Sequence, residues 1–279
     1  MTSTWSSFPT WSLLLVAAGA VLSGVVPGCG EPRSEPAVEL SKTDAPVWFE
    51  DVTDRVGVDF IIDTGPTDTY FMPQLVGSGC AAYDLDGDGR PDLLFLTNGG
   101  PHSTSKNKLY RQRPDGTFED VSAGSGLDFA GHNMGIAIGD FDNDGKPDVL
   151  ITQYTGVRLF RNLGGMKFQD VTEAAGIHDP LWGASACFLD YDRDGRLDLF
   201  ICNYIDYDPA WDCTAPGGGK DFCAPSVFAG TCSKLFRNLG PGPGGSNPFR
   251  GCLCRLRHRE DPRSRARGDC RGLRWRWLA

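Results

Sequence analysis

The chain has 279 residues, enough for one or two domains with a substantial core. Its 36 glycines and 19 prolines favour many turns over long helices, and no long apolar stretch of helical period follows residue 40. The net charge is −9, but the last thirty residues hold ten arginines and three acidic residues; subtracting that +7 leaves −16 on residues 1–249. Composition therefore predicts an all-β protein with an acidic body.

The chain begins with a predicted export signal. An apolar run from Leu13 to Val26 is long enough for a signal peptide and short for a membrane span. It leads into Val26-Pro-Gly-Cys29, which resembles the lipobox of bacterial lipoproteins, although residues 1–12 contain no Lys or Arg. We expect residues 1–29 to be a signal peptide with lipidation at Cys29, in a cell-envelope lipoprotein whose membrane contact is the lipid alone. Ordinary secretion with a chance Cys29 is the alternative.

Residues 30–46 are Pro-rich and charged, and they predict a flexible tether. A repeat region, 47–249, follows. Its main feature is an acidic nonapeptide, Asp-x-Asp-x-Asp-Gly-x-x-Asp, at 84–92, 140–148 and 190–198. Each copy lies between a Gly-rich segment and an apolar, β-favouring stretch, which predicts strand, loop and strand.

A second element follows each acidic loop. It reads Lys108-Leu-Tyr-Arg111, Arg158-Leu-Phe-Arg-Asn162 and Lys234-Leu-Phe-Arg-Asn238. The first two copies lead to Phe118-Glu-Asp-Val-Ser122 and Phe168-Gln-Asp-Val-Thr172, and Phe49-Glu-Asp-Val-Thr53 is an earlier copy of that third element. Phe118 to Asp140 and Phe168 to Asp190 both span 22 positions. A repeat of this size with about four short strands predicts the blade of a β-propeller, here an incomplete ring.

The acidic loops predict Ca²⁺ as the cofactor. The carboxylates at positions 1, 3, 5 and 9 and the carbonyl at position 7 are hard oxygen ligands, and Gly at position 6 permits the turn. An EF-hand is excluded, because position 12 is Phe95, Ile151 or Ile201 rather than Glu. We expect the ions to be structural. The predicted ligands are Asp84, Asp86, Asp88, Arg90, Asp92, Asp140, Asp142, Asp144, Lys146, Asp148, Asp190, Asp192, Asp194, Arg196 and Asp198.

These motifs resemble known repeats. The acidic loops and flanking strands look like the FG-GAP/VCBS repeats of integrin α-subunit propellers. The Phe-x-Asp-Val-Thr and Leu-Phe-Arg-Asn elements look like those of bacterial relatives of cartilage acidic protein, a group often carrying an ASPIC/UnbV module. The resemblance covers residues 48–249 and implies an extracellular calcium-binding propeller, a binding or adhesion module for a protein or polysaccharide ligand. Such propellers commonly have seven blades.

The Arg-rich tail, 250–279, interrupts the pattern. Read one nucleotide later, back-translated codons from Gly272 permit Asp-Phe-Asp-Gly-Asp-Gly-Trp, and those of Arg250-Gly-Cys permit Glu-Asp-Val after Phe249. We therefore expect a frame shift near Phe249, which genomic sequence across this codon tests. The competing interpretation is an Arg-rich arm for nucleic acid or anionic membrane. An exported acidic protein is a poor candidate for that role, so no nucleic-acid partner is expected.

The third repeat contains an insertion. Asp198 and Leu235 are 37 positions apart, against 11 between Asp148 and Leu159. Export permits disulfides, and we expect Cys213 to pair with Cys223 within the insertion. Its aromatic residues either contact a ligand or pack the insertion onto its blade: Tyr204, Tyr207, Trp211 and Phe222.

No catalytic machinery is expected. The chain has four histidines and no Gly-x-Ser-x-Gly motif or zinc-ligand spacing, and calcium accounts for the paired carboxylates. His132, before the second acidic loop, is expected to be a strand-end residue. The alternative is a propeller enzyme, a hydrolase or lyase, whose active site lies in further blades.

Overall fold

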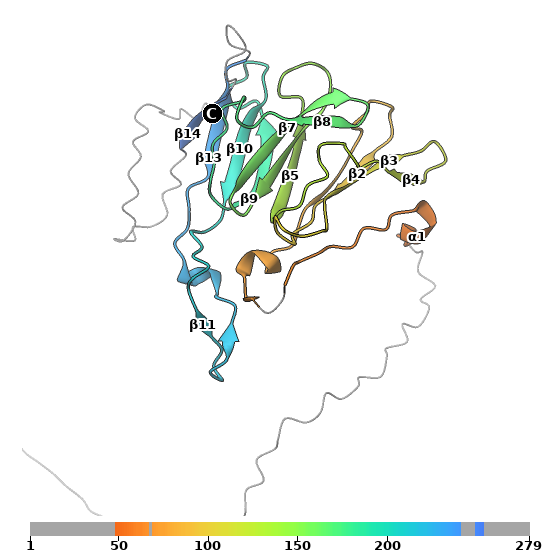
Figure 1. Ribbon diagram of the computed structural model, residues 1–279. Helices are drawn as coiled ribbons and strands as arrows, with labels where there is room; N and C mark the ends of the chain where they lie inside the picture. The colour runs from red at the N-terminus through yellow and green to blue at the C-terminus, as the bar shows by residue number, and fades with distance from the viewer. Residues whose placement is uncertain (1–47, 67–68, 241–248, 254–279) are drawn as a thin grey trace, which may run out of the picture. The chain divides into compact units, whose positions relative to one another are not determined.

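The computed structural model describes residues 48–66, 69–240 and 249–253. The chain divides into two units, 1–50 and 51–279, and every helix and strand described belongs to the second unit (Figure 1). The predicted signal region with Cys29, the tether and residues 254–279 lie outside the described residues. Within the described part, no helix has the length and apolar character needed to cross a membrane.

Three four-stranded antiparallel sheets follow one another along the chain, each with its strands in sequence order. The first contains β1 (Cys80–Tyr83), β2 (Asp92–Phe95), β3 (Lys108–Gln112) and β4 (Phe118–Asp120). The second contains β5 (Asn133–Gly139), β6 (Asp148–Gln153), β7 (Gly156–Gly164) and β8 (Lys167–Asp170). The third contains β9 (Gly183–Leu189), β10 (Asp198–Asn203), β13 (Lys234–Asn238) and β14 (Phe249–Leu253). Each sheet corresponds to one predicted repeat.

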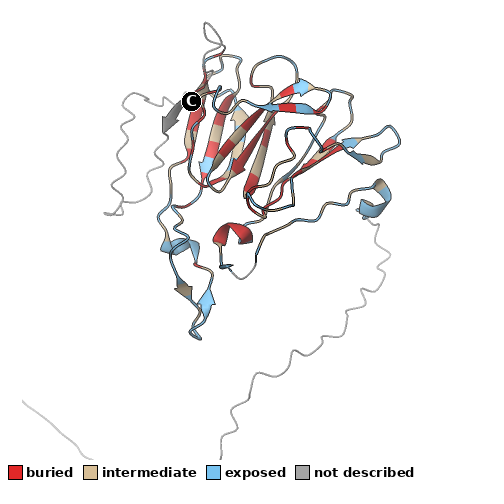
Figure 2. Ribbon diagram, viewed as in Figure 1, coloured by how far each residue is buried: buried red, intermediate tan, exposed pale blue. Residues whose placement is uncertain are grey.

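The sheets pack face to face through two apolar cores. Leu94 of the first sheet and Leu96, just after β2, share a core with Val149 and Ile151 of the second sheet. The other face of β6 presents Leu150, which shares a second core with residues of the third sheet. Because β6 is covered on both faces, five of its six residues are buried, and its apolar run is continuous rather than alternating (Figure 2).

The arrangement is that of a partial β-propeller. Each sheet is a meander, and β5 lies beside both β1 and β9, so the first strands of successive sheets are neighbours. The predicted all-β class is confirmed: the helical residues described are the four of α1 (Thr53–Val56) and the short 3₁₀ turns η2 (Met72–Leu75) and η3 (Pro225–Val227). The described residues form no closed ring.

Phe249 takes the same place in its sheet as the phenylalanines that begin the earlier fourth strands. Phe118 is opposite Gln112, Phe168 is opposite Asn162, and Phe249 is opposite Asn238. The Phe249 amide donates to Ala175 O at 3.2 Å, as the Phe168 amide donates to Ser125 O at 2.7 Å. The register of the repeat therefore extends through Phe249.

The leading copy of this element, Phe49–Thr53, is not in a strand. Its local hydrogen bonds are nevertheless those of the later copies: Asp51 accepts from the amide and hydroxyl of Thr53, as Asp170 does from Thr172. No third strand of a preceding sheet occurs within the described ranges, which explains why this segment keeps the turn and lacks the pairing.

The insertion in the third repeat extends beyond the end of β10. It carries a two-stranded hairpin, β11 (Cys213–Thr214) and β12 (Lys220–Asp221), and then η3. Most of its residues are exposed, in contrast to the strands of the sheets (Figure 2).

Candidate metal centres

Each acidic nonapeptide forms the connection between the first two strands of its sheet: β1 to β2, β5 to β6, and β9 to β10. Position 6 of every loop is a glycine with φ near +80°: Gly89 (85°), Gly145 (85°) and Gly195 (82°). A left-handed conformation at this position requires a residue without a Cβ to avoid strain, which explains the glycine. The turn folds the loop back so that its side chains converge.

The aspartate at position 1 organises the turn from within. Asp140 Oδ1 accepts from the Asp144 amide at 3.0 Å, and its Oδ2 accepts from the Gly145 amide at 2.9 Å. Asp84 and Asp190 bind the equivalent amides in their own loops. The loop shape is therefore set by contacts within six residues.

The aspartate at position 9 joins the loop to the third strand. Asp148 is fully buried; its Oδ2 accepts from the Phe141 amide at 3.0 Å and its Oδ1 from the Asn162 amide at 2.8 Å. Burial raises the pKa of Asp148 to about 7. The same pair of bonds and the same cause of a raised pKa recur at Asp92 and Asp198.

The remaining acidic positions face cationic side chains. Position 3 lies 2.6 Å from the Nε of an arginine on the third strand, in the pairs Asp86–Arg111, Asp142–Arg161 and Asp192–Arg237. Position 5 pairs with the side chain at position 7, in Asp88–Arg90, Asp144–Lys146 and Asp194–Arg196. The carbonyl at position 7 remains a predicted ligand.

Three carboxylate groups come together in each loop. Positions 1, 3 and 9 have oxygens within 4.8 Å of one another in the first two loops, and positions 1, 3 and 5 do so in the third. Asp88, Asp144 and Asp198 are the predicted carboxylates that these groups do not include.

The donor set fits a hard cation. Every converging atom is a carboxylate oxygen, the ligand type that calcium prefers. Asp192 Oδ1 is buried and has no hydrogen-bond partner in the described chain. Since a buried, unpaired carboxylate oxygen is costly, this atom has the environment expected of a ligand whose cation would complete its coordination.

The opposite end of the sheets is aromatic. Tyr207 of the insertion contacts the rings of Phe71, Tyr154 and Trp182 at centroid distances of 5.7 to 5.9 Å, and its hydroxyl accepts from the Met72 amide at 3.3 Å. Tyr204 meets Trp182 edge to face at 5.3 Å. Tyr207 therefore packs the insertion onto the sheets.

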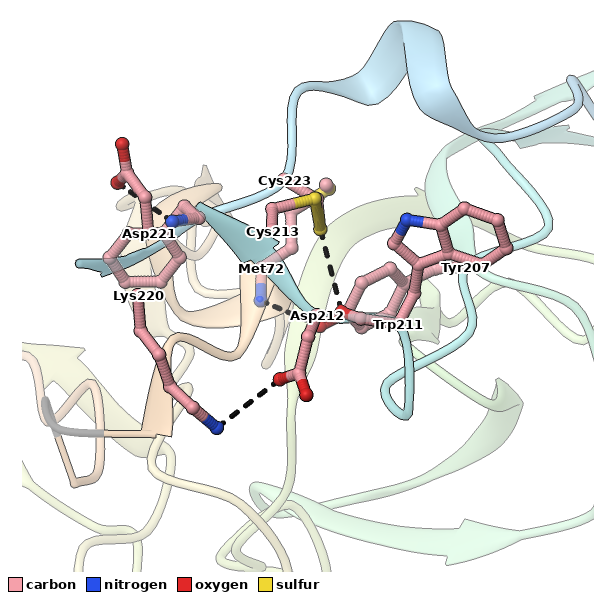
Figure 3. The surroundings of a disulfide bond; sticks show 9 residues. Met72, Tyr207, Trp211, Asp212, Cys213, Lys220, Asp221 and Cys223 are labelled. Carbon is pink, nitrogen blue, oxygen red and sulfur yellow. Dashed lines mark hydrogen bonds and ion pairs between the residues drawn. A yellow bond between two sulfur atoms is a disulfide. The ribbon is translucent and has the colours of Figure 1, made fainter. Parts of the chain in front are cut away.

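Two other aromatic residues of the insertion differ in exposure. Trp211 has 57% of its surface accessible, whereas Phe222 is half-buried and contacts Tyr70 at 5.3 Å. A disulfide joins Cys213 to Cys223 beside Trp211, whose carbonyl oxygen lies 3.5 Å from Cys223 Sγ (Figure 3). The ligand-contact interpretation therefore suits the exposed Trp211 better than Tyr207.

His132 lies immediately before β5, next to Phe71 at 4.9 Å, and its Nδ1 is 3.0 Å from Asn98 O. Burial lowers the pKa of His132. Its contacts are those of a residue holding the start of a strand.

Sequence reasoning missed the role of the Leu-Phe-Arg-Asn element. Its arginine faces the acidic loop, and its asparagine crosses to the preceding sheet: Asn162 Nδ2 donates to Leu85 O, and Asn238 Nδ2 to Phe141 O, both at 2.8 Å. The recurrence of arginine in all three copies, and of Arg-Asn in the second and third, was the signal that could have indicated both contacts.

Serial four-stranded meanders with an acidic loop between their first two strands define the class as a propeller-type repeat protein. The family model described as FG-GAP-like repeat matches residues 84–151 and 140–201. The chain is 33% identical over 86 residues to cartilage acidic protein 1 of Xenopus tropicalis and 32% identical over 81 residues to that of Homo sapiens. These alignments cover 30% and 29% of the chain and 12% of each relative, so the chain spans about an eighth of their length. The chain thus contains FG-GAP-like repeats within residues 84–201 and resembles cartilage acidic protein 1 over about 30% of its length. The similarity and the disulfide indicate an extracellular protein.

Proposed function

We propose that this chain is a calcium-binding extracellular propeller module that binds a protein or polysaccharide ligand, with calcium in a structural role. The observation that carries the proposal is the threefold recurrence of converging carboxylate oxygens at the same turn of consecutive sheets. Each loop bridges two strands and is tied to a third through position 9. A cation held there would fasten three strands of one sheet together.

A structural role follows from the position of these loops. Without a cation, four nearby carboxylates repel one another, and the buried aspartate at position 9 is costly to ionise. A bound divalent cation would remove both costs and stabilise the folded state by mass action. Exported calcium modules bind at about 10⁻⁴–10⁻³ M, which suits extracellular concentrations.

Calorimetric titration and thermal melting of the full chain test the proposal. We expect Ca²⁺ to bind with heat and to raise the melting temperature. Asp86→Ala and Asp142→Ala should each reduce the number of sites by one. Asp115→Ala, in the exposed β3–β4 turn, is the matched control and should leave binding unchanged. A wild-type chain with neither heat nor thermal shift would remove the calcium proposal.

The anchoring proposal concerns Cys29. The apolar run and the Val-Pro-Gly-Cys sequence support lipidation of this cysteine in a bacterial envelope. Palmitate labelling of the full chain in a bacterial host should be lost in Cys29→Ser. Equal labelling of both proteins would refute the anchor and leave ordinary secretion.

We propose binding rather than catalysis because the clustered carboxylates face cationic side chains and because His132 holds the start of strand β5. The exposed ring of Trp211 and the half-buried ring of Phe222 are the proposed ligand-contact groups of the insertion. Loops on a rigid scaffold commonly carry binding residues, and exposed aromatic rings suit either a protein or a polysaccharide surface.

A further inference from the structure

One arginine in each sheet occupies the same place relative to its acidic loop. These arginines, Arg111, Arg161 and Arg237, stand on β3, β7 and β13. In every case Nε lies 2.6 Å from the Oδ2 of the position 3 aspartate. A terminal guanidinium nitrogen also lies 3.2 to 3.4 Å from the position 5 aspartate. Three repetitions make this contact a property of the repeat.

The contact with position 3 is one of charge. The Nε atoms of Arg161 and Arg237 are buried and have no hydrogen-bond partner within the described ranges, although the carboxylate is 2.6 Å away. The N–H groups are therefore not aligned with that oxygen, as they would be in a bidentate clamp. What the arginine supplies to position 3 is a positive charge at short range.

The acidic loops keep a net negative charge that a divalent cation would neutralise. With all four aspartates ionised, each of the first two loops carries −4, and the strand arginine and the cationic residue at position 7 carry +2, so −2 remains. The third loop also contains Arg193 at position 4, so −1 remains there. The arginine and the ion thus interact with the same carboxylates.

We infer that the positive charges of Arg111, Arg161 and Arg237 compete with the bound ion for the loop carboxylates. This competition lowers the affinity of each loop for the ion. This inference rests on the proposed calcium function. A unit positive charge a few ångströms from a divalent cation opposes binding by an amount equivalent to roughly tenfold in affinity, even with water-like screening. The position 3 carboxylates are 6% to 21% exposed, so solvent screens them incompletely.

The third loop offers a local reporter. Tyr191 occupies position 2, between two predicted ligands, and can sensitise the luminescence of Tb³⁺ bound in that loop. Competition of Ca²⁺ against Tb³⁺ then reports calcium affinity at this site, and Tyr191→Phe identifies the emission that belongs to it. The measurement uses the full 279-residue chain.

We expect Arg237→Met to lower the Ca²⁺ concentration for half-competition by about tenfold, while Arg237→Lys, which keeps the charge, stays near wild type. Arg158→Met is the matched control: Arg158 lies on β7 with similar exposure but pairs with Asp170, outside the loop, and should change nothing. An unchanged or weakened affinity in Arg237→Met would overturn the inference and assign the arginine a structural role.

Failure of the calcium proposal gives a different result, because wild-type protein would then show no Tyr191-dependent emission and no response to Ca²⁺. Thermal melting of Arg161→Met provides a second measurement should Arg237→Met fail to fold. The rise in melting temperature on adding Ca²⁺ should be larger than in wild type, since tighter binding stabilises the folded state more. An equal or smaller rise would contradict the inference.

Discussion

The two ends of the strands in this molecule differ in how they are built. At the acidic-loop end, three loops repeat the same hydrogen bonds, ion pairs and glycine turns residue for residue. At the other end, each sheet is different: an aromatic cluster, a long insertion and a disulfide occur there once. The repeated end has the features of a scaffold, and the irregular end has those of a surface specific to this protein.

This difference suggests that stability and ligand recognition depend on opposite ends of the strands. Features that recur in every sheet close its acidic loop and attach the sheet to the neighbouring sheet. A feature present once cannot be required by the repeat and is available for a ligand. The following predictions test this division.

The largest effect is expected at the asparagine that connects successive sheets. Asn162 is 1% exposed; its Nδ2 donates to Leu85 O and Pro147 O, and its Oδ1 accepts from the Gly164 amide. Asn162→Ala removes three buried hydrogen bonds and should lower the free energy of unfolding by about 3 kcal/mol, measured by denaturant unfolding.

Asn238→Ala should lower the free energy of unfolding by the same amount as Asn162→Ala, within about 0.5 kcal/mol. The reason is that Asn238 makes the equivalent bonds to Phe141, Leu197 and Gly240. The control is Gln169→Ala, an exposed residue on β8, with an effect near zero. Unequal costs at the two asparagines would show that the repeated end is less regular in energy than in geometry.

At the irregular end, substitution of a packed and of an exposed aromatic residue of the insertion should change stability by different amounts. Tyr207→Ala removes four ring contacts and the bond to Met72, and we expect a loss of about 2 kcal/mol. Trp211→Ala removes a mostly exposed ring and should change stability by less than about 0.5 kcal/mol. Thermal melting compares the two; a costly Trp211→Ala would assign that ring to packing and weaken the ligand-contact proposal.

The same division explains what the sequence predicted. The turn of each acidic loop could be predicted because the bonds within the loop join residues at most seven positions apart, so the motif itself contains the turn. The asparagine bridge could not, because Asn162 and Leu85 are 77 positions apart and no spacing rule relates them. The packing of Tyr207 could not be predicted from the sequence either, since its partners Phe71, Tyr154 and Trp182 come from three separate segments.

A gain in stability, smaller than the losses at Asn162 and Tyr207, is expected at position 4 of the acidic loops, where the repeated end departs from regularity. This position has a left-handed conformation in all three loops: Gly87 at φ 78°, Asn143 at 57° and Arg193 at 60°. The conformation suits glycine, is tolerated by asparagine and costs about 1–2 kcal/mol for a residue such as arginine. The third loop therefore contains backbone strain that the first loop lacks.

Arg193→Gly should raise the free energy of unfolding by about 1 kcal/mol, because relief of this strain exceeds the entropy that glycine adds to the unfolded chain. Asn143→Gly is the matched substitution at the same position of the second loop and should raise the free energy of unfolding by less. Gly87→Ala, in the first loop, should lower the free energy of unfolding by about as much as Arg193→Gly raises it. Denaturant unfolding in excess Ca²⁺ and in chelator measures all three. A destabilised Arg193→Gly in both conditions would mean that the Arg193 side chain makes a contact worth more than the strain, and the third loop would then differ from the others in function as well as in sequence.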